Sequence, residues 1–252
     1  MKQYIVKHPK IKNILYTTAS ALFWVGLWWF ASFLINKEVV LPSPVAVIMR
    51  LFINAAKPDF WIITFLSLLR IIIGFLSALI LGIIISFLSY YIKIFRTLFS
   101  PIINIFKAAP VASFIILLYI WLSTNIIPAV TAFIIVLPII WENIHAGLNN
   151  TDKNLNEVCE IYRIKGFKKI KLFYIPSIKP YLSAAVLSSF GMAWKAGVAA
   201  EVLTTPKYSI GKQLYNAKIY LESADLFAWT VVIIVISFII ERIFIKRLKK
   251  KI

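Results

Sequence analysis

The sequence contains six apolar runs that are each long enough to cross the hydrocarbon core of a bilayer, which is about 30 Å thick. The runs lie near residues 14–35, 61–91, 98–122, 126–144, 178–203 and 226–245. Hydrophobic residues make up 61% of the chain and charged residues only 15%, a balance that ordinary soluble domains do not have. These runs predict an all-α fold, a polytopic bundle of six transmembrane helices in membrane lipid. They leave no stretch for a separate soluble catalytic domain.

The first run follows a basic start, which contains Lys2, Lys7, Lys10 and Lys12. The run is too long for a cleaved signal peptide and no small-residue cleavage site follows it, so we expect a retained anchor. The expected parts of the chain are an N-terminal segment with the first span (1–35), an external segment (36–60), a core of five spans (61–245) with a cytoplasmic loop (146–176), and a basic tail (246–252).

The positions of the Lys and Arg residues predict the orientation of the chain. Placing the N-terminus in the cytoplasm assigns eighteen of the 28 bases to the cytoplasmic side and six to the outside. Because Lys and Arg concentrate in cytoplasmic loops, we expect a multi-pass protein of the cell membrane with both termini in the cytoplasm. The same bias explains the net charge of +18 without a nucleic-acid partner.

Few residues are available for metal or redox chemistry. Cys159 is the only cysteine, so the chain forms no intrachain disulfide and no Cys-rich metal cluster. The two histidines, His8 and His145, do not stand in H-E-x-x-H spacing, and we expect no bound metal. A membrane enzyme would need such a site, and an ATP-independent secondary carrier would usually show two similar halves with ionisable residues at mid-membrane. Both classes remain alternatives.

Two external segments have helical patterns. Ser43 followed by Pro44 is typical of a helix start, and Ile48, Leu51, Phe52 and Ala55 then share one face at helical spacing. In the segment before the last span, Leu214, Ala217 and Leu221 likewise share one side. Each helix either anchors the bundle at the interface or forms a lid or docking surface for an external partner.

Small residues recur at every fourth position in two spans. The positions are Gly74, Ala78, Gly82 and Ser86 in the second span, and Ala185, Ser189, Ala193 and Gly197 in the fifth. Such ridges allow helix backbones to approach closely, so we expect both helices to be central. The ridges serve packing, or sliding between helices during gating. Pro101, Pro110, Pro128 and Pro138 interrupt the third and fourth spans, which therefore need not be straight.

The most polar long stretch is "NEVCEIYRIKGFKKIKLFYIP", residues 156–176, in the predicted cytoplasmic loop. Leu155, Val158, Cys159 and Tyr162 have the i, i+3, i+4, i+7 spacing of one helical face. Gly166 interrupts this amphipathic helix, and we expect Phe167 to be exposed at the turn. The apolar face must pack on membrane, on its own bundle or on a partner protein.

The loop resembles the "EAA" loop of permease subunits of ABC importers. The resemblance runs from Glu157, Val158 and Cys159 to Ile175 and Pro176, with the proline nineteen positions after the acid. The stretches "LPSP", "SLLRIIIGF", "KAAPVASFIILLYIWLS" and "GMAWKAGVAAEVL" are similar to the nitrate/sulfonate/taurine branch of that family. The resemblance therefore covers nearly the whole chain.

The loop also departs from the family pattern. The family usually has glycine six residues after the acid, where this chain has Arg163 and places its own glycine at Gly166. Val158 and Cys159 replace the usual alanine pair. These changes bear on the geometry of the turn, while the helix and the terminal Ile-Pro remain.

The resemblance implies a type I ABC importer permease fold, similar to the methionine importer, with a cytoplasmic coupling helix between the fourth and fifth spans. No G-x-x-x-x-G-K-[ST] phosphate loop occurs, so ATP and Mg²⁺ would be held by a separate ATP-binding subunit, and the chain itself would be no enzyme and carry no cofactor. The other implied partners are an external substrate-binding protein and a second permease subunit, as a homodimer. The implied cargo is a small solute such as nitrate, a sulfonate, taurine, or a thiamine or riboflavin precursor. The expected ATPase-coupling residues are Glu157, Val158, Cys159, Tyr162, Gly166, Phe167 and Pro176.

Charges within the spans raise a separate question, because they are costly in lipid. Arg70 and Lys195 lie in the second and fifth spans, and Glu201 lies near the end of the fifth. These residues either attract an anion along the pathway, or form a structural ion pair in which Arg70 or Lys195 binds Glu201. We favour the ion pair, since charges inside membranes are commonly paired. Glu142 and His145 are expected to be satisfied at a helix end.

Overall fold

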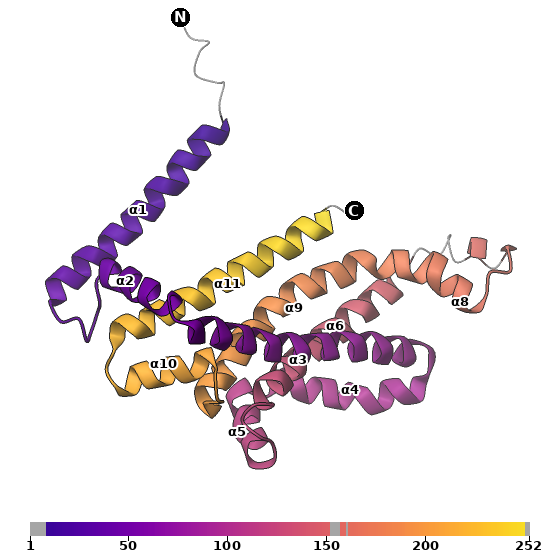
Figure 1. Cartoon of the computed structure of the whole chain (residues 1–252). Coiled ribbons are helices and arrows are strands. Elements are labelled where there is room, and N and C mark those ends of the chain that lie inside the picture. Colours follow the sequence, from indigo (N-terminus) through magenta and orange to yellow (C-terminus); the bar gives the residue numbers. More distant parts are fainter. Residues whose placement is uncertain (1–8, 152–156, 160, 250–252) are drawn as a thin grey trace, which may run out of the picture.

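The computed structural model describes residues 9–151, 157–159 and 161–249, and only the backbone of residues 9–15, 167 and 243–249. Within this part of the chain the regular structure is entirely helical (Figure 1). The elements are α1 (Pro9–Ile35), α2 (Pro44–Ala55), α3 (Pro58–Tyr91), α4 (Lys93–Ala108), α5 (Val111–Trp121), α6 (Ile127–Asn149), α8 (Gly166–Lys169), the π-helix η1 (Ile170–Tyr174), α9 (Ile175–Thr204), α10 (Ile210–Ile219) and α11 (Ser223–Lys249).

Five helical segments in the described residues are long and apolar enough to cross a membrane. They are residues 16–35, 58–91, 127–149, 170–204 and 223–242. The pair α4 and α5 makes a sixth if it counts as one span, but the two helices meet at an angle of 110°. The all-α polytopic bundle predicted from the sequence is therefore confirmed, and the third span is bent, as its prolines indicated.

Proline explains the break in the third span. Ala109 ends α4 in an extended conformation, and Pro110 precedes α5. A proline disfavours the helical conformation for the residue before it, so the chain turns at this point. Pro101 and Pro138, by contrast, lie inside α4 and α6 without ending either helix.

The central helix is α6, which packs along α3 and along α9. The sequence predicted α3 and α9 as central helices, which their packing on α6 and on each other confirms, but it did not indicate the place of α6 between them. All eight small residues of the two predicted ridges are buried: Gly74, Ala78, Gly82 and Ser86 in α3, and Ala185, Ser189, Ala193 and Gly197 in α9. At Gly74 an added Cβ atom would lie 2.0 Å from the carbonyl oxygen of Ala129 in α6, so only glycine permits this approach.

Helix α1 lies at the edge of the bundle and points away from it (Figure 1). Its described side chains are nearly all exposed, and its main contact is with α2. Trp28 Nε1 donates to Pro42 O at 3.1 Å, and Ser32 Oγ donates to Leu41 O at 2.9 Å. Its apolar surface is suited to lipid or to another subunit.

The start of α2 is as predicted. Ser43 Oγ accepts a hydrogen bond from Ala46 N at 3.2 Å, and Pro44 occupies the first turn. On the predicted apolar face, Ile48 and Phe52 are 52% and 71% exposed, so these two side chains do not pack on the bundle. Helix α2 instead packs through Val47, 2% exposed, and contacts α11.

Two ion pairs fix this orientation of α2. The Arg50 side chain lies 3.2 Å from Asp225 and 3.9 Å from Glu222, and Asn54 Nδ2 donates to Asp225 Oδ1 at 2.7 Å. In α10, Leu214 is partly buried and Ala217 is buried, as predicted. Leu221 follows the end of that helix and is 66% exposed, so it is not part of the face.

Candidate functional site

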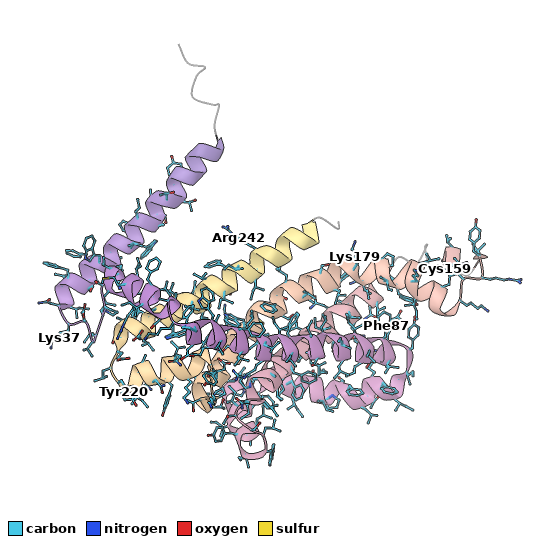
Figure 2. The ribbon with its side chains drawn as sticks, viewed as in Figure 1. Lys37, Phe87, Cys159, Lys179, Tyr220 and Arg242 are labelled. Atoms are coloured by element: carbon cyan, nitrogen blue, oxygen red, sulfur yellow. The ribbon has the colours of Figure 1, made fainter. Side chains whose placement is uncertain are left out.

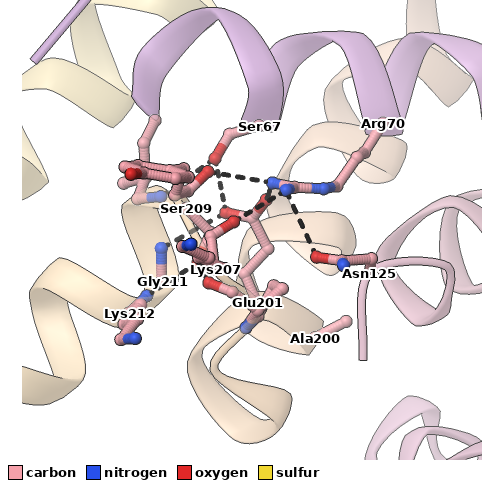
Figure 3. A network of polar contacts seen from close by, with 12 residues as sticks. Ser67, Arg70, Asn125, Ala200, Glu201, Lys207, Ser209, Gly211 and Lys212 are labelled. Atoms are coloured by element: carbon pink, nitrogen blue, oxygen red, sulfur yellow. Dashed lines mark hydrogen bonds and ion pairs between the residues drawn. The ribbon is translucent and has the colours of Figure 1, made fainter. Parts of the chain in front are cut away.

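The polar network around Glu201 joins α3, α9 and α10 (Figure 3). The Glu201 side chain, in the last turn of α9, is fully buried. Its Oε2 accepts from Ser67 Oγ at 2.8 Å and from Gly211 N at 3.2 Å, and its Oε1 lies 3.4 Å from Arg70 Nη1. Ser67 Oγ also accepts from Ile210 N at 2.9 Å. The carboxylate is thus held by donors from two other helices.

Arg70 connects this network to the loop after α9. Its Nη2 donates to Lys207 O at 2.8 Å and to Asn125 Oδ1 at 3.4 Å, while its Nη1 also donates to Tyr208 O at 3.1 Å. The guanidinium of Arg70 therefore donates its hydrogen bonds to groups of the same chain (Figure 3). The arrangement is that of a structural ion pair holding three helices and a loop in register.

Lys195 is not part of this network. It is exposed and forms no ion pair among the described residues. It lines a pocket of about 580 Å³ between the α4–α5 break, α6 and α9. The other lining residues are Phe106, Lys107, Ala109, Val111, Ile135, Pro138, Ile139, Glu142, Met192, Ala196 and Ala199.

Lys107 and Glu142 form an ion pair across this pocket, between α4 and α6. Glu142 is therefore satisfied by a partner that the sequence did not indicate. His145 packs against Trp141 with ring centroids 4.5 Å apart, but its buried Nε2 has no hydrogen-bond partner within residues 16–151 or the other described side chains. The expectation that His145 is satisfied at a helix end is wrong.

The predicted coupling loop divides its apolar residues between two environments. Cys159 is 7% exposed and belongs to the core, with Phe173 and Tyr174. Val158 and Tyr162 are 43% and 74% exposed. The loop thus exposes Val158 and Tyr162, while Cys159 packs in the core. Leu155 lies outside the described residues, and so does the side chain of Phe167.

Two residues of the turn have a positive φ. Arg163 has a φ of 51° and Gly166 a φ of 59°, both in the left-handed region that favours glycine. Ile164 N donates to Cys159 O at 2.8 Å and closes the turn. Arg163 thus adopts a left-handed conformation at the position where the family usually has glycine.

After the turn, the chain passes through α8 and η1 into α9. Pro176 lies in the first turn of α9, which continues from η1 without a break, since Tyr174 and Ile175 both have helical backbone angles. Figure 2 shows Cys159 near the tip of the molecule, beyond Lys179 and Phe87. We call this end of the bundle the α8 end, and the opposite end, which carries α10, the α10 end.

Comparison with known proteins identifies the family of this chain. Residues 78–250 match the family described as the binding-protein-dependent transport system inner membrane component. The chain belongs to this family.

Relatives of this permease family carry small solutes according to their names. The nitrate import permease protein NrtB of Synechococcus elongatus is 26% identical over 212 residues, which cover 79% of this chain and 75% of NrtB. The putative aliphatic sulfonates transport permease protein SsuC of Bacillus subtilis is 22% identical, covering 85% of this chain and 78% of SsuC. The bicarbonate transport system permease protein CmpB of Synechococcus elongatus is 22% identical, covering 82% of this chain and 78% of CmpB.

A solved structure shares the fold. The crystal structure of an amino acid ABC transporter with histidines matches with a TM-score of 0.55 at 18% identity, covering 88% of this chain and 95% of that one. The permease is thus a multi-pass inner membrane protein with the type I importer fold.

Sequence reasoning missed several residues of these sites. Ser67 and Gly211 complete the Glu201 network, and an added Cβ at Gly211 would lie 2.3 Å from the backbone of Glu201. Gly147 lets α6 approach α9, since a Cβ there would lie 3.2 Å from Ile178 Cα. The sequence spacing of Ser67, Gly211 and Gly147 does not indicate these contacts. The one available signal was the presence of a glycine, Gly147, near the end of a predicted span.

Proposed function

We propose that this chain is the permease subunit of an ATP-driven importer that moves a small solute delivered by an external binding protein. The chemistry of ATP hydrolysis, with Mg²⁺, belongs to a separate ATP-binding subunit in this proposal. Two copies of the permease would form the complete pathway. The family membership and the shared fold support it.

The observation that carries the proposal is the exposed apolar surface of the coupling loop. Val158, Ile161 and Tyr162 are 43%, 76% and 74% exposed within six residues of the loop's turn. A short helix recognises a partner by placing such side chains in a groove. Because Cys159 beside them is anchored in the core, a force applied to these residues reaches α9 through Phe173 and Tyr174.

The orientation of the chain follows from the same proposal. The α8 end would face the cytoplasm and the ATPase, together with both termini. The α10 end, with α2 and α10 packed against α11, would face the binding protein. The excess of bases in the predicted cytoplasmic loops supports this direction.

The pocket beside Lys195 is the proposed part of the translocation path. It lies at the bent junction of α4 and α5, where irregular backbone is tolerated in a membrane only if it is buried or lines a cavity. Lys195 would present a positive charge to the solute, while Arg70 and Glu201 would keep α3, α9 and α10 together.

Co-purification tests the coupling surface. We expect Tyr162→Asp to reduce the amount of ATP-binding subunit retained on the detergent-extracted permease at least tenfold, because a charge cannot enter an apolar groove. Tyr220→Asp is the matched control, since Tyr220 is 72% exposed at the α10 end. Equal retention of the ATPase by both variants would count against the proposed contact.

A further inference from the structure

A polar pocket of about 510 Å³ lies at the α8 end, where α3 ends and α4 begins. It is separate from the pocket beside Lys195 and from the exposed coupling surface. Lys93 and Arg96, from the first turns of α4, line it together with Ser89, Tyr90 and Tyr91 of α3. The function proposed above uses none of these residues.

The pocket has an uncompensated positive charge. Its lining includes no acidic side chain. Neither Lys93 nor Arg96 forms an ion pair among the described residues. Both lie on one face of α4, together with Ser100, which also lines the pocket. Two cations facing one cavity favour an anion.

Ser89 gives a second, independent indication of a ligand. It is 2% exposed, and its Oγ has no hydrogen-bond partner in the part of the chain that the structure describes. Other hydroxyls of α3 donate to the carbonyl one turn earlier, as Ser77 does to Ile73 and Ser86 to Gly82. A buried hydroxyl without a partner is costly, and an acceptor in the pocket would satisfy it.

The first turn of α4 also favours an anion in this pocket. Its N-cap, Ile92, provides no side-chain hydrogen bond, so the first amides of this sixteen-residue helix lack a capping acceptor. The negative end of the α3 dipole lies at the same junction, so the uncapped first amides of α4, rather than a net helix dipole, are what this end provides for an anion. Helix N-termini of this kind bind phosphate groups.

The position of the pocket along the bundle indicates which kind of phosphate it would bind. It lies where the apolar α3 ends, beside Tyr90 and Tyr91. Tyrosines concentrate at the boundary between hydrocarbon and headgroups. The rings of Tyr90 and Tyr91 also contact Tyr174, at centroid distances of 6.1 and 5.9 Å, so the pocket adjoins the segment that leads out of the coupling loop.

We propose that this pocket binds the phosphodiester headgroup of an anionic membrane lipid. Lys93 and Arg96 pair with the phosphate oxygens, and Ser89 Oγ donates to one of them. The acyl chains lie along the exposed apolar side chains of α4, including Ile94 and Leu98, which are 69% and 61% exposed. A bound lipid then stiffens the junction beside Tyr174.

Lipid titration of the full-length permease, measured by native mass spectrometry from detergent, tests the proposal. Phosphatidylglycerol should bind more tightly than phosphatidylcholine with the same acyl chains. Lys93→Gln and Arg96→Gln should each weaken phosphatidylglycerol binding roughly fivefold and leave phosphatidylcholine binding unchanged. Lys171→Gln, which removes an exposed lysine of the same end outside the pocket, is the matched control and should have no effect.

Three outcomes would overturn the proposal. The first is equal binding of the two lipids, and the second is an equal loss of phosphatidylglycerol binding in Lys171→Gln. The third is displacement of phosphatidylglycerol by millimolar inorganic phosphate, which would assign the pocket to a free anion. The conservative variant Ser89→Ala should weaken phosphatidylglycerol binding while the protein keeps its elution volume, which separates loss of the site from loss of folding.

Discussion

At the scale of single residues, the structure separates two cations that the sequence treated alike. Arg70 binds the fully buried Glu201 and two carbonyl oxygens of the following loop. Lys195 is exposed in a pocket and has no such partner among the described residues. A buried carboxylate that loses its cation is strongly destabilised, because its desolvation is no longer offset. The two residues therefore have different expected effects when changed.

We expect Arg70→Gln to lower the free energy of unfolding by about 3 kcal/mol, since it leaves Glu201 buried without its positive partner. Lys195→Gln, the control, should change stability by less than about 0.5 kcal/mol because its side chain is exposed. Denaturation of the detergent-solubilised subunit measures both. Equal stability of the two variants would show that Arg70 is dispensable to the fold.

At the scale of helices, close approach depends on a few positions. Gly74 lets α3 touch the backbone of Ala129 in α6, and Gly197 lets α9 touch the side chain of Ile71 in α3. Gly191, in α9, has no atom within 4 Å of an added Cβ. Helix packing therefore requires glycine at positions 74 and 197 but leaves space for a side chain at position 191.

Gly74→Ala should destabilise the bundle by about 1–3 kcal/mol, because the new methyl group would clash with a backbone oxygen that cannot move aside. Gly191→Ala is the control and should be neutral or slightly stabilising, since alanine favours helix and space is available. Thermal unfolding in one detergent compares the two. A Gly74→Ala variant as stable as Gly191→Ala would contradict the observed α3–α6 contact.

At the scale of the whole molecule, the two ends of the bundle have different surfaces. The α8 end carries the exposed loop and the basic pocket, and the α10 end carries α2 and α10 packed on α11. The proposed function requires these ends to face opposite sides of the membrane. Tyr162 and Tyr220 are similarly exposed and mark the two ends.

A single-thiol experiment tests this orientation. Cys159→Ser removes the only cysteine, and Tyr162→Cys or Tyr220→Cys then adds one exposed thiol. In intact cells, a membrane-impermeant thiol reagent should label Tyr220→Cys and spare Tyr162→Cys. In inverted vesicles the labelling should be reversed. Labelling of both from one side would refute the topology.

The sequence alone determined the features that depend on neighbours along the chain. The lengths of the apolar runs gave the spans, Ser43 and Pro44 gave the start of α2, and Pro110 gave the break in the third span. These features follow from local backbone sterics, hydrogen bonding and the thickness of a bilayer, which residue type and spacing express directly.

The tertiary structure alone decided which distant groups meet. Arg70 rather than Lys195 binds Glu201, α6 lies between α3 and α9, and α2 packs through Val47 rather than Ile48. In a chain this apolar, several faces of a helix satisfy the same periodicity, so the pattern does not select one. The selection is made by close backbone packing and by the pairing of buried charges, and both depend on contacts between helices far apart in the sequence.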